Sequence, residues 1–395
     1  MTTGIGARIL ALRTGRGLTQ RDLAEPNYTA AYVSSVENGH RVPSSDALAH
    51  FAARLAVDVA ELSTGRRPGE ALELDIELLT MSHSQQWYSG IAASSTEPGE
   101  RRAEASIVLG RIESAVDAAA AHFERAHRLL ADAPPHHRAA AVAGRAWCAR
   151  RQGDPGYAAY LLGALRDELV RAELPAPGAL LAVQTLLGLC QNDLGEDPAP
   201  AVATALELAP AGDPARTAEL HLTVARTLAA TGDPGGAAAA LDAARQARLA
   251  DWLAAPIAEV RRLRGRARLA TGDLGGALAD FTAASAGLPG DPDLAADLAV
   301  TYRALGSSAT AAALLADVAS DTAAVHRARA LLDPEAAEGH LRAAIALLKP
   351  TGPRRDLADA VLALADHLTA AGRTEEALDT LADGLAAVDA LGRPS

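Results

Sequence analysis

The chain has 395 residues and a formal net charge of −12, and this length allows two or three domains. Apolar residues make up 49% of the chain and aromatic residues only 3%, with alanine and leucine dominating the apolar share. Strands rely on valine, isoleucine, threonine and aromatic residues, so this composition argues against a β-sandwich, barrel or propeller and favours helices. We therefore expect an all-α protein.

The charge is distributed unevenly along the chain. Residues 1–68 carry eight arginines and six acidic residues, a balance of +2, so the remainder carries −14. The first ten residues lack the pattern of a signal peptide, and the longest uncharged stretch, residues 174–192, contains two prolines and several polar side chains. With only two cysteines in addition, these features predict a cytoplasmic protein without a membrane span.

The first 65 residues predict five short helices. Apolar residues recur at helical spacing, and Thr19, Thr29 and Ser44 are placed to cap the second, third and fourth helices. A short turn containing Pro26 separates the second helix from the third. An Arg-Arg-Pro-Gly sequence after residue 65 indicates a boundary, so the first domain is expected to cover residues 1–68.

The sequence LTQRDLAxxxxTAAYVSSVENGHRVPS, residues 18–44, resembles the helix-turn-helix of Cro/CI-type repressors, the XRE family. The LTQxxLA opening, the VSxVENG ending and the following PS occur in the order typical of that family, and the resemblance covers about the first 65 residues. The turn between the two helices is about one residue shorter than the commonest form. The resemblance implies a five-helix Cro/CI-type domain that binds a double-stranded DNA operator.

The third helix is the expected recognition helix. Its short side chains should face outward, where alanine methyl groups contact thymine and serine hydroxyls bond to base edges. The N-terminus of the second helix suits a DNA phosphate. The expected DNA-binding residues are Gln20, Arg21, Thr29, Ala30, Ala31, Tyr32, Ser34, Ser35, Asn38, His40 and Arg41. The alternative is that the domain serves as an interaction module and no longer reads DNA.

From about residue 95 onward the chain repeats a spacing in which a small residue, glycine and alanine are separated by six and four residues. The glycines are Gly110, Gly153, Gly232, Gly272, Gly306 and Gly372, with Gly195 a partial match. Several units place a large apolar residue nine positions after the glycine, the last being Leu381. The spacing resembles the tetratricopeptide repeat, which implies an α-solenoid over residues 95–392, with residues 69–94 as a connecting helix or linker.

In repeats of this type, residues two, three, six, ten and thirteen positions before the turn glycine face the concave groove. This offset selects, as expected ligand-binding residues, Trp147, Arg151, Asn192, Arg226, Arg262, Arg266 and Arg303. Because arginine forks bind carboxylates and phosphates, the expected effector is a peptide, a protein or an anionic small molecule. The alternative is that these arginines pair with neighbouring acids.

The sequence contains no Gly-x4-Gly-Lys-Ser/Thr phosphate loop, HExxH helix or Gly-x-Ser-x-Gly turn, so no enzymatic activity, metal or cofactor is expected. The pairing of modules resembles the peptide-responsive regulators of Gram-positive bacteria and the repeat-containing regulators of actinobacterial secondary metabolism. We therefore expect a homodimeric transcriptional regulator whose repeats bind an effector. The alternative is a protein-interaction scaffold in which the helix-turn-helix domain serves dimerisation.

Overall fold

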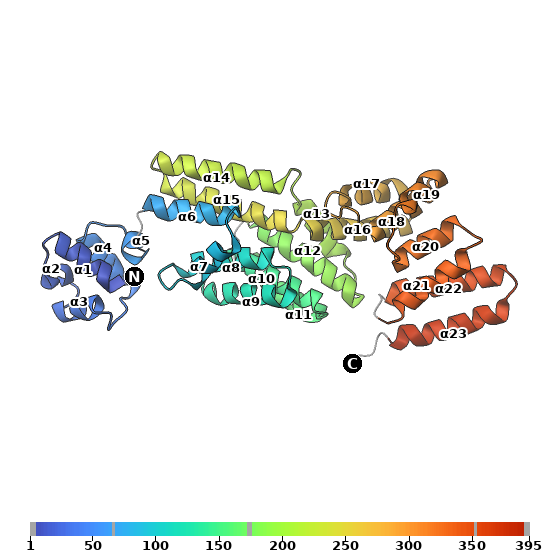
Figure 1. The fold of residues 1–395 in the computed structure, drawn as a ribbon, viewed down its shortest axis with the longest axis horizontal. Helices are drawn as coiled ribbons and strands as arrows, with labels where there is room; N and C mark the ends of the chain where they lie inside the picture. The colour runs from blue at the N-terminus through green and yellow to red at the C-terminus, as the bar shows by residue number, and fades with distance from the viewer. Residues whose placement is uncertain (1–4, 65–67, 172–175, 351–353, 391–395) are drawn as a thin grey trace. The chain divides into compact units, whose positions relative to one another are not determined.

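The computed structural model describes residues 5–64, 68–171, 176–350 and 354–390 (Figure 1). These residues form 23 α-helices and no strand, which confirms the all-α prediction. None of these helices combines the length and the hydropathy that a membrane span requires. The described residues fall into two compact units, which come from Met1–Gln152, Glu168–Ala179 and Pro210–Asp251 and from Gly153–Asp167, Leu180–Ala209 and Trp252–Ser395, respectively.

The first unit begins with the five predicted helices: α1 (Ile5–Gly15), α2 (Gln20–Ala24), α3 (Ala30–Glu37), α4 (Ser45–Arg54) and α5 (Val59–Thr64). The three predicted caps are confirmed, because the hydroxyls of Thr19, Thr29 and Ser44 each accept a hydrogen bond from a backbone N–H in the first turn of their helix. The predicted boundary after residue 65 lies partly outside the described residues.

These five helices enclose a core that includes Ile9, Leu23, Val33 and Phe51, all of them fully buried. Helix α1 approaches α3 closely at Gly6. A Cβ atom on Gly6 would lie 2.1 Å from the Val36 carbonyl oxygen, which is closer than van der Waals contact allows. The absence of a side chain at Gly6 therefore sets the distance between the two helices.

The rest of the first unit contains α6 (Pro68–Thr80), α7 (Gln85–Ala93), α8 (Gly99–Ile112), α9 (Val116–Leu129), α10 (Pro135–Arg151), α14 (Pro214–Ala230) and α15 (Pro234–Trp252). The predicted connecting segment, residues 69–94, thus holds two helices, α6 and α7. Ile76 and Leu79 of α6 pack against Leu222 of α14 and Leu241 of α15, although more than 140 residues separate the two segments. Helix α6 is therefore anchored in this unit by apolar burial.

The second unit contains α13 (Ala199–Leu208), α16 (Ala254–Ala270), α17 (Leu274–Ala284), α18 (Pro292–Ala304), α19 (Ser308–Ala316), α20 (Ala323–Leu332), α21 (Ala337–Leu348), α22 (Arg354–Ala370) and α23 (Thr374–Ala390). Sequential helices pack in pairs, α16 with α17, α18 with α19, α20 with α21 and α22 with α23. Two further helices, α11 (Pro155–Arg171) and α12 (Pro177–Leu194), contribute residues to both units. The predicted repeats are therefore helix pairs.

The turn glycines of the repeats adopt left-handed backbone conformations. Their φ angles lie between +74° and +89° at Gly153, Gly195, Gly232, Gly272, Gly306 and Gly372. A residue with a Cβ atom pays about 1–2 kcal/mol in this region, so glycine is the residue that ends the first helix of each pair without strain. The alanine five positions later is buried in the five units where it follows such a glycine, which confirms the close approach of the paired helices.

Two predicted repeat positions are wrong. Gly110 lies inside α8 rather than in a turn, and a Cβ atom there would come within 2.8 Å of the Phe123 ring on α9. Phe123 also touches Gly144 of α10, so both glycines make room for one ring. Leu381 is 37% exposed instead of buried.

Candidate nucleic-acid interface and repeat groove

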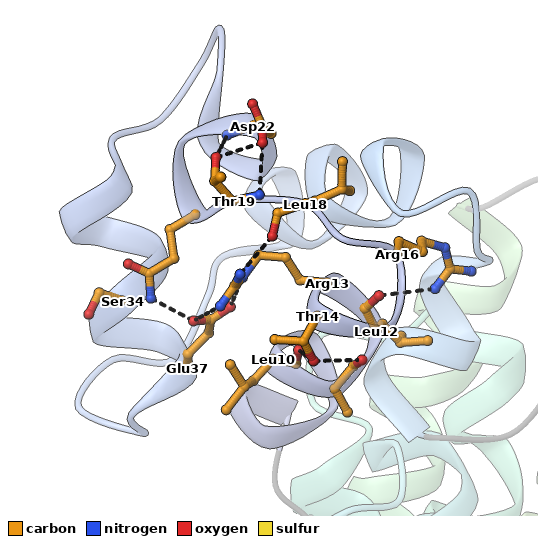
Figure 2. Close-up of polar contacts among 12 residues, drawn as sticks. Leu10, Leu12, Arg13, Thr14, Arg16, Leu18, Thr19, Asp22, Ser34 and Glu37 are labelled. Carbon is orange, nitrogen blue, oxygen red and sulfur yellow. Dashed lines mark hydrogen bonds and ion pairs between the residues drawn. The ribbon is translucent and has the colours of Figure 1, made fainter.

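A buried ion pair connects α1 to α3 in the N-terminal domain. The Arg13 Nε donates to Glu37 Oε1 at 2.6 Å and its Nη2 donates to Glu37 Oε2 at 3.1 Å, while Nη1 donates to the Leu18 carbonyl oxygen at 2.8 Å. Figure 2 shows these contacts. The hydrogen bond to Glu37 raises the pKa of Arg13 above its ordinary value against the opposing effect of burial. The side chains are 11% and 2% exposed, so the pair fixes α3, the expected recognition helix, on α1.

Gln20 belongs to the same network, a role that our sequence interpretation missed. Its Nε2 donates to Glu37 Oε2 at 2.7 Å, so the side chain expected to contact a phosphate also supports α3. The sequence carried a signal for this network. Arg13 follows the core residue Ile9 by four positions, and Glu37 follows the core residue Val33 by four, so both charges fall on buried helix faces.

The expected recognition helix α3 carries its short side chains on the face opposite its core residues. Thr29 caps the helix by accepting from the Tyr32 backbone N–H at 3.2 Å. Ala31 is exposed, and Ala30, Ser34 and Ser35 are half-buried, whereas the core residues of α3 lie on its opposite face. The side-chain amide nitrogen (Nδ2) of Asn38 donates to the Ser34 carbonyl oxygen at 2.9 Å. This face can therefore meet a base edge with methyl and hydroxyl groups, as the pattern predicts.

The exposed cations of this surface are held beside aromatic and acidic side chains. The Arg41 guanidinium carbon lies 5.0 Å from the centroid of the Tyr32 ring, which stacks on Tyr28 at 5.1 Å. Arg21 is 80% exposed and its Nε donates to Glu25 at 2.7 Å. A surface ion pair of this kind is weak and exchanges readily for a phosphate. His40 is exposed and lies next to Arg41 in the sequence.

Other arginines of this domain stabilise its fold. Arg8 donates to the Leu62 carbonyl oxygen at 3.1 Å. Arg54 donates to the Asp22 carbonyl oxygen through Nε at 3.0 Å and through Nη2 at 2.5 Å. These contacts connect α1 to α5 and α4 to α2. The basic excess of the N-terminal segment therefore includes structural arginines as well as exposed ones.

The seven predicted groove residues are divided between the two units. The first unit holds Trp147, Arg151 and Arg226, and the second holds Asn192, Arg262, Arg266 and Arg303. Asn192 and Arg303 are exposed. On α10, the guanidinium carbons of Arg150 and Arg151 lie 5.9 and 5.8 Å from the centroid of the half-buried Trp147 ring. These three residues form an aromatic surface flanked by positive charge.

Three of the predicted groove arginines pair with acids, which was the alternative interpretation. Arg262 Nε lies 2.5 Å from Asp297 Oδ2, and Arg266 Nε lies 3.0 Å from the same oxygen. Arg226 Nε lies 3.2 Å from Glu73 of α6. Asp297 is buried, so it neutralises two guanidiniums at the packed faces of α16 and α18. These arginines do not form the unpaired positive wall that the offset predicts.

The described residues contain no group of three or more His, Cys, Asp or Glu side chains that could hold a metal ion. Both cysteines, Cys148 and Cys190, are buried. Burial raises the pKa of the Cys148 thiol to about 11. This thiol is therefore neutral near pH 7 and serves packing rather than nucleophilic chemistry.

Comparison with known proteins agrees with the N-terminal geometry. Residues 5–64 match a family model described as a helix-turn-helix domain. No protein of curated function matches the chain in sequence. Residues 5–64 thus form a helix-turn-helix domain, and paired, tetratricopeptide-like helices follow it.

Similar solved structures include three helical proteins, each of which is 15% identical to this chain. The alignment with Bacillus thuringiensis PlcR in complex with the peptide PapR7 and DNA covers 87% of this chain and 99% of that chain, with a TM-score of 0.28. The alignment with the Rap protein complexed with Competence and Sporulation Factor covers 98% of this chain and 99% of that chain, with a TM-score of 0.40. The alignment with the human IFIT1 dimer with m7Gppp-AAAA covers 98% of this chain and 90% of that chain, with a TM-score of 0.35. All three TM-scores lie below 0.5.

Proposed function

We propose that the chain is a DNA-binding transcriptional regulator. The main support for this proposal is the geometry of the recognition helix α3. A buried ion pair holds this helix in place, and its short side chains and the neighbouring Arg21 and Arg41 remain accessible. A rigid helix with small outward side chains can enter the major groove, and flanking cations fix its register on the phosphates. These features support DNA reading over retention of the fold for dimerisation.

Within this proposal, the residues divide by role. Arg21 and Arg41 bind phosphates, and Tyr32, Asn38 and His40 add backbone contacts. The base edges meet Thr29, Ala30, Ala31, Ser34 and Ser35. Gln20 keeps its amide oxygen and one N–H for the DNA while its other N–H is used by Glu37. The absence of an arginine or glutamine on the outer face of α3 limits each half-site to modest specificity.

The test compares two variants in a mobility-shift titration at several salt concentrations. Replacing Arg21 and Arg41 by alanine should weaken binding to all duplexes and reduce the slope of log K against log salt by about 0.9 per lost phosphate contact. Replacing Ser34 and Ser35 by alanine should change the preference among sites instead. A control that removes Arg128 and Arg216, which are exposed on α9 and α14, carries the same charge change and should behave like the native chain.

We also propose a homodimer that binds two half-sites. One small module with short reading side chains contacts too few base pairs for a unique operator, and a dimer doubles the contacts at a spacing of about 34–36 Å or a multiple. Light scattering of the chain with and without operator DNA checks this. Tight binding of one chain to an asymmetric site would contradict it.

The repeat-bearing part is proposed to bind an effector, with a peptide or protein as the first choice and an anionic small molecule as the second. The support is the surface formed by Trp147, Arg150 and Arg151 on α10. An effector that used Arg262 or Arg266 would have to displace Asp297. Replacing Arg151 by glutamate and measuring DNA binding with and without cell extract tests this role. An unchanged response to extract in the folded variant would exclude Arg151 from effector binding.

A further inference from the structure

A cavity with a water-accessible volume of about 100 Å³ lies within the first unit, between α6, α8 and α15. Asp75 and Leu78 line it from α6, Glu100 and Glu104 from α8, and Arg245 from α15. Because one water molecule needs about 10–15 Å³ on this measure, the cavity has room for a ligand of roughly seven or eight non-hydrogen atoms. None of these residues belongs to the proposed DNA interface or to the predicted groove.

The guanidiniums that line the cavity are already matched by carboxylates. Arg101 donates to Asp75 Oδ1 through Nε at 2.5 Å and to Oδ2 through Nη2 at 3.1 Å. The Arg245 Nε lies 3.4 Å from Glu104, and its Nη1 donates to Asp242 at 2.6 Å. A bidentate pair such as that of Arg101 leaves little capacity for an anionic ligand.

Glu100 leaves the cavity with an excess of negative charge. It is exposed at the rim and makes no ion pair with any other described residue. Three carboxylates, Asp75, Glu100 and Glu104, therefore face two guanidiniums. Burial lowers the pKa of Arg101 and of Arg245, yet their own partner carboxylates, chiefly Asp75 for Arg101 and Glu104 with Asp242 for Arg245, raise both pKa values on balance.

We propose that this cavity binds a small organic cation, namely a primary ammonium group on a short apolar chain. An ammonium carries three N–H donors and can donate to carboxylates on α6 and α8 at once. The apolar chain fits against Leu78 and Pro98, which complete the lining. A neutral molecule of the same shape leaves the charge excess uncompensated, and an anion is repelled by it.

The position of the cavity gives such a ligand a structural effect. Helix α6 begins at Pro68, shortly after α5 ends at Thr64, so it is the first helix after the helix-turn-helix domain. A cation between Asp75 and Glu100 adds a bridge between α6 and α8. It therefore stabilises the folded unit in proportion to its occupancy.

The test is calorimetric titration of the full chain with n-butylammonium chloride, with n-butanol and sodium butyrate as neutral and anionic ligands of similar size. Two variants are compared, Glu100→Gln at the cavity and Glu219→Gln at an exposed position of α14 as the matched control. We expect saturable binding of n-butylammonium alone. Its affinity should fall at least tenfold in Glu100→Gln, remain unchanged in Glu219→Gln, and stay within about threefold in Glu100→Asp, which keeps the charge.

Three results would overturn the proposal: no saturable binding of n-butylammonium to the native chain, equal affinity in Glu100→Gln, or equal binding of n-butanol. Circular dichroism of each variant confirms that the fold is retained. Because the titration contains no DNA, its outcome is independent of the proposed regulatory function. A raised thermal midpoint in n-butylammonium, absent in Glu100→Gln, is the second expected readout.

Discussion

Replacing Gly6 by alanine tests whether the close approach of α1 to α3 holds the recognition helix in place. The new Cβ atom would lie 2.1 Å from the Val36 carbonyl oxygen and 2.8 Å from that of Glu37. Contacts shorter than 3.0 Å are not tolerated, so α1 must move by roughly 1 Å. The obstructing atoms belong to the backbone of α3, so they cannot rotate away as a side chain would.

The expected cost follows from two opposing terms. Alanine in place of glycine improves helix propensity by about 1 kcal/mol, while overpacking a closed interface costs about 1–3 kcal/mol. The displacement also lengthens the bonds between Arg13 and Glu37, which join the same two helices. The two terms leave a net loss of up to about 2 kcal/mol, and because the ion pair is weakened as well we expect the upper value, about 2 kcal/mol in local stability.

Hydrogen exchange of the full chain measures this loss, because exchange reports the opening of each helix separately. Amides of α1 and α3 in Gly6→Ala should exchange about 30-fold faster than in the native chain. Gly15→Ala is the matched control in the same helix, since a Cβ atom there meets nothing within 4 Å. It should leave exchange unchanged or slow it slightly. Equal protection in the two variants would refute the packing argument.

Three further predictions concern the helix pairs. Asp297→Ala removes the shared partner of Arg262 and Arg266, and hydrogen exchange should show a loss of about 2 kcal/mol in the local stability of α16 and α18. Asp317→Ala, at an exposed position, should have no effect. Gly265→Ala brings a Cβ atom to 2.6 Å from the Phe281 ring and should lower local stability by about 1–3 kcal/mol in the same measurement. Gly275→Ala, where a Cβ atom meets nothing within 4 Å, should leave local stability unchanged or raise it. The pKa of Cys148 is about 11 in the folded chain, so little of its thiol is ionised at pH 8. In the folded chain it should therefore react with a disulfide reagent at pH 8 at least about 100-fold more slowly than in the chain unfolded by urea. Equal rates would contradict its burial.

The features that the sequence predicted well depend on neighbouring residues. A threonine just before a helix caps it locally, because its hydroxyl accepts a hydrogen bond from a backbone N–H of the first turn, and a glycine at the end of a helix provides the left-handed residue that the turn requires. Thr19, Thr29 and Gly272 therefore behave as predicted. The helix-turn-helix boundaries follow from such local signals.

The features that were missed depend on partners far away in the chain. Arg262 and Arg266 receive their acid from a position more than 30 residues later, and the offset rule contains no information about that acid. Gly110 matches the repeat spacing, yet the position of Phe123 shows that it corresponds to the small packing residue and not to the turn. Spacing alone cannot distinguish these two uses of glycine, because both require the absence of a side chain.

Selection of binding sites from a random duplex pool by the full chain tests whether α3 reads DNA. Several rounds of selection followed by sequencing should enrich a two-fold symmetric motif, with half-sites separated by one helical turn or a multiple. The Ser34→Ala, Ser35→Ala double variant should enrich a changed motif, and the control without Arg128 and Arg216 should enrich the native one. A selected pool that remains as random as the starting pool would show that α3 does not read DNA.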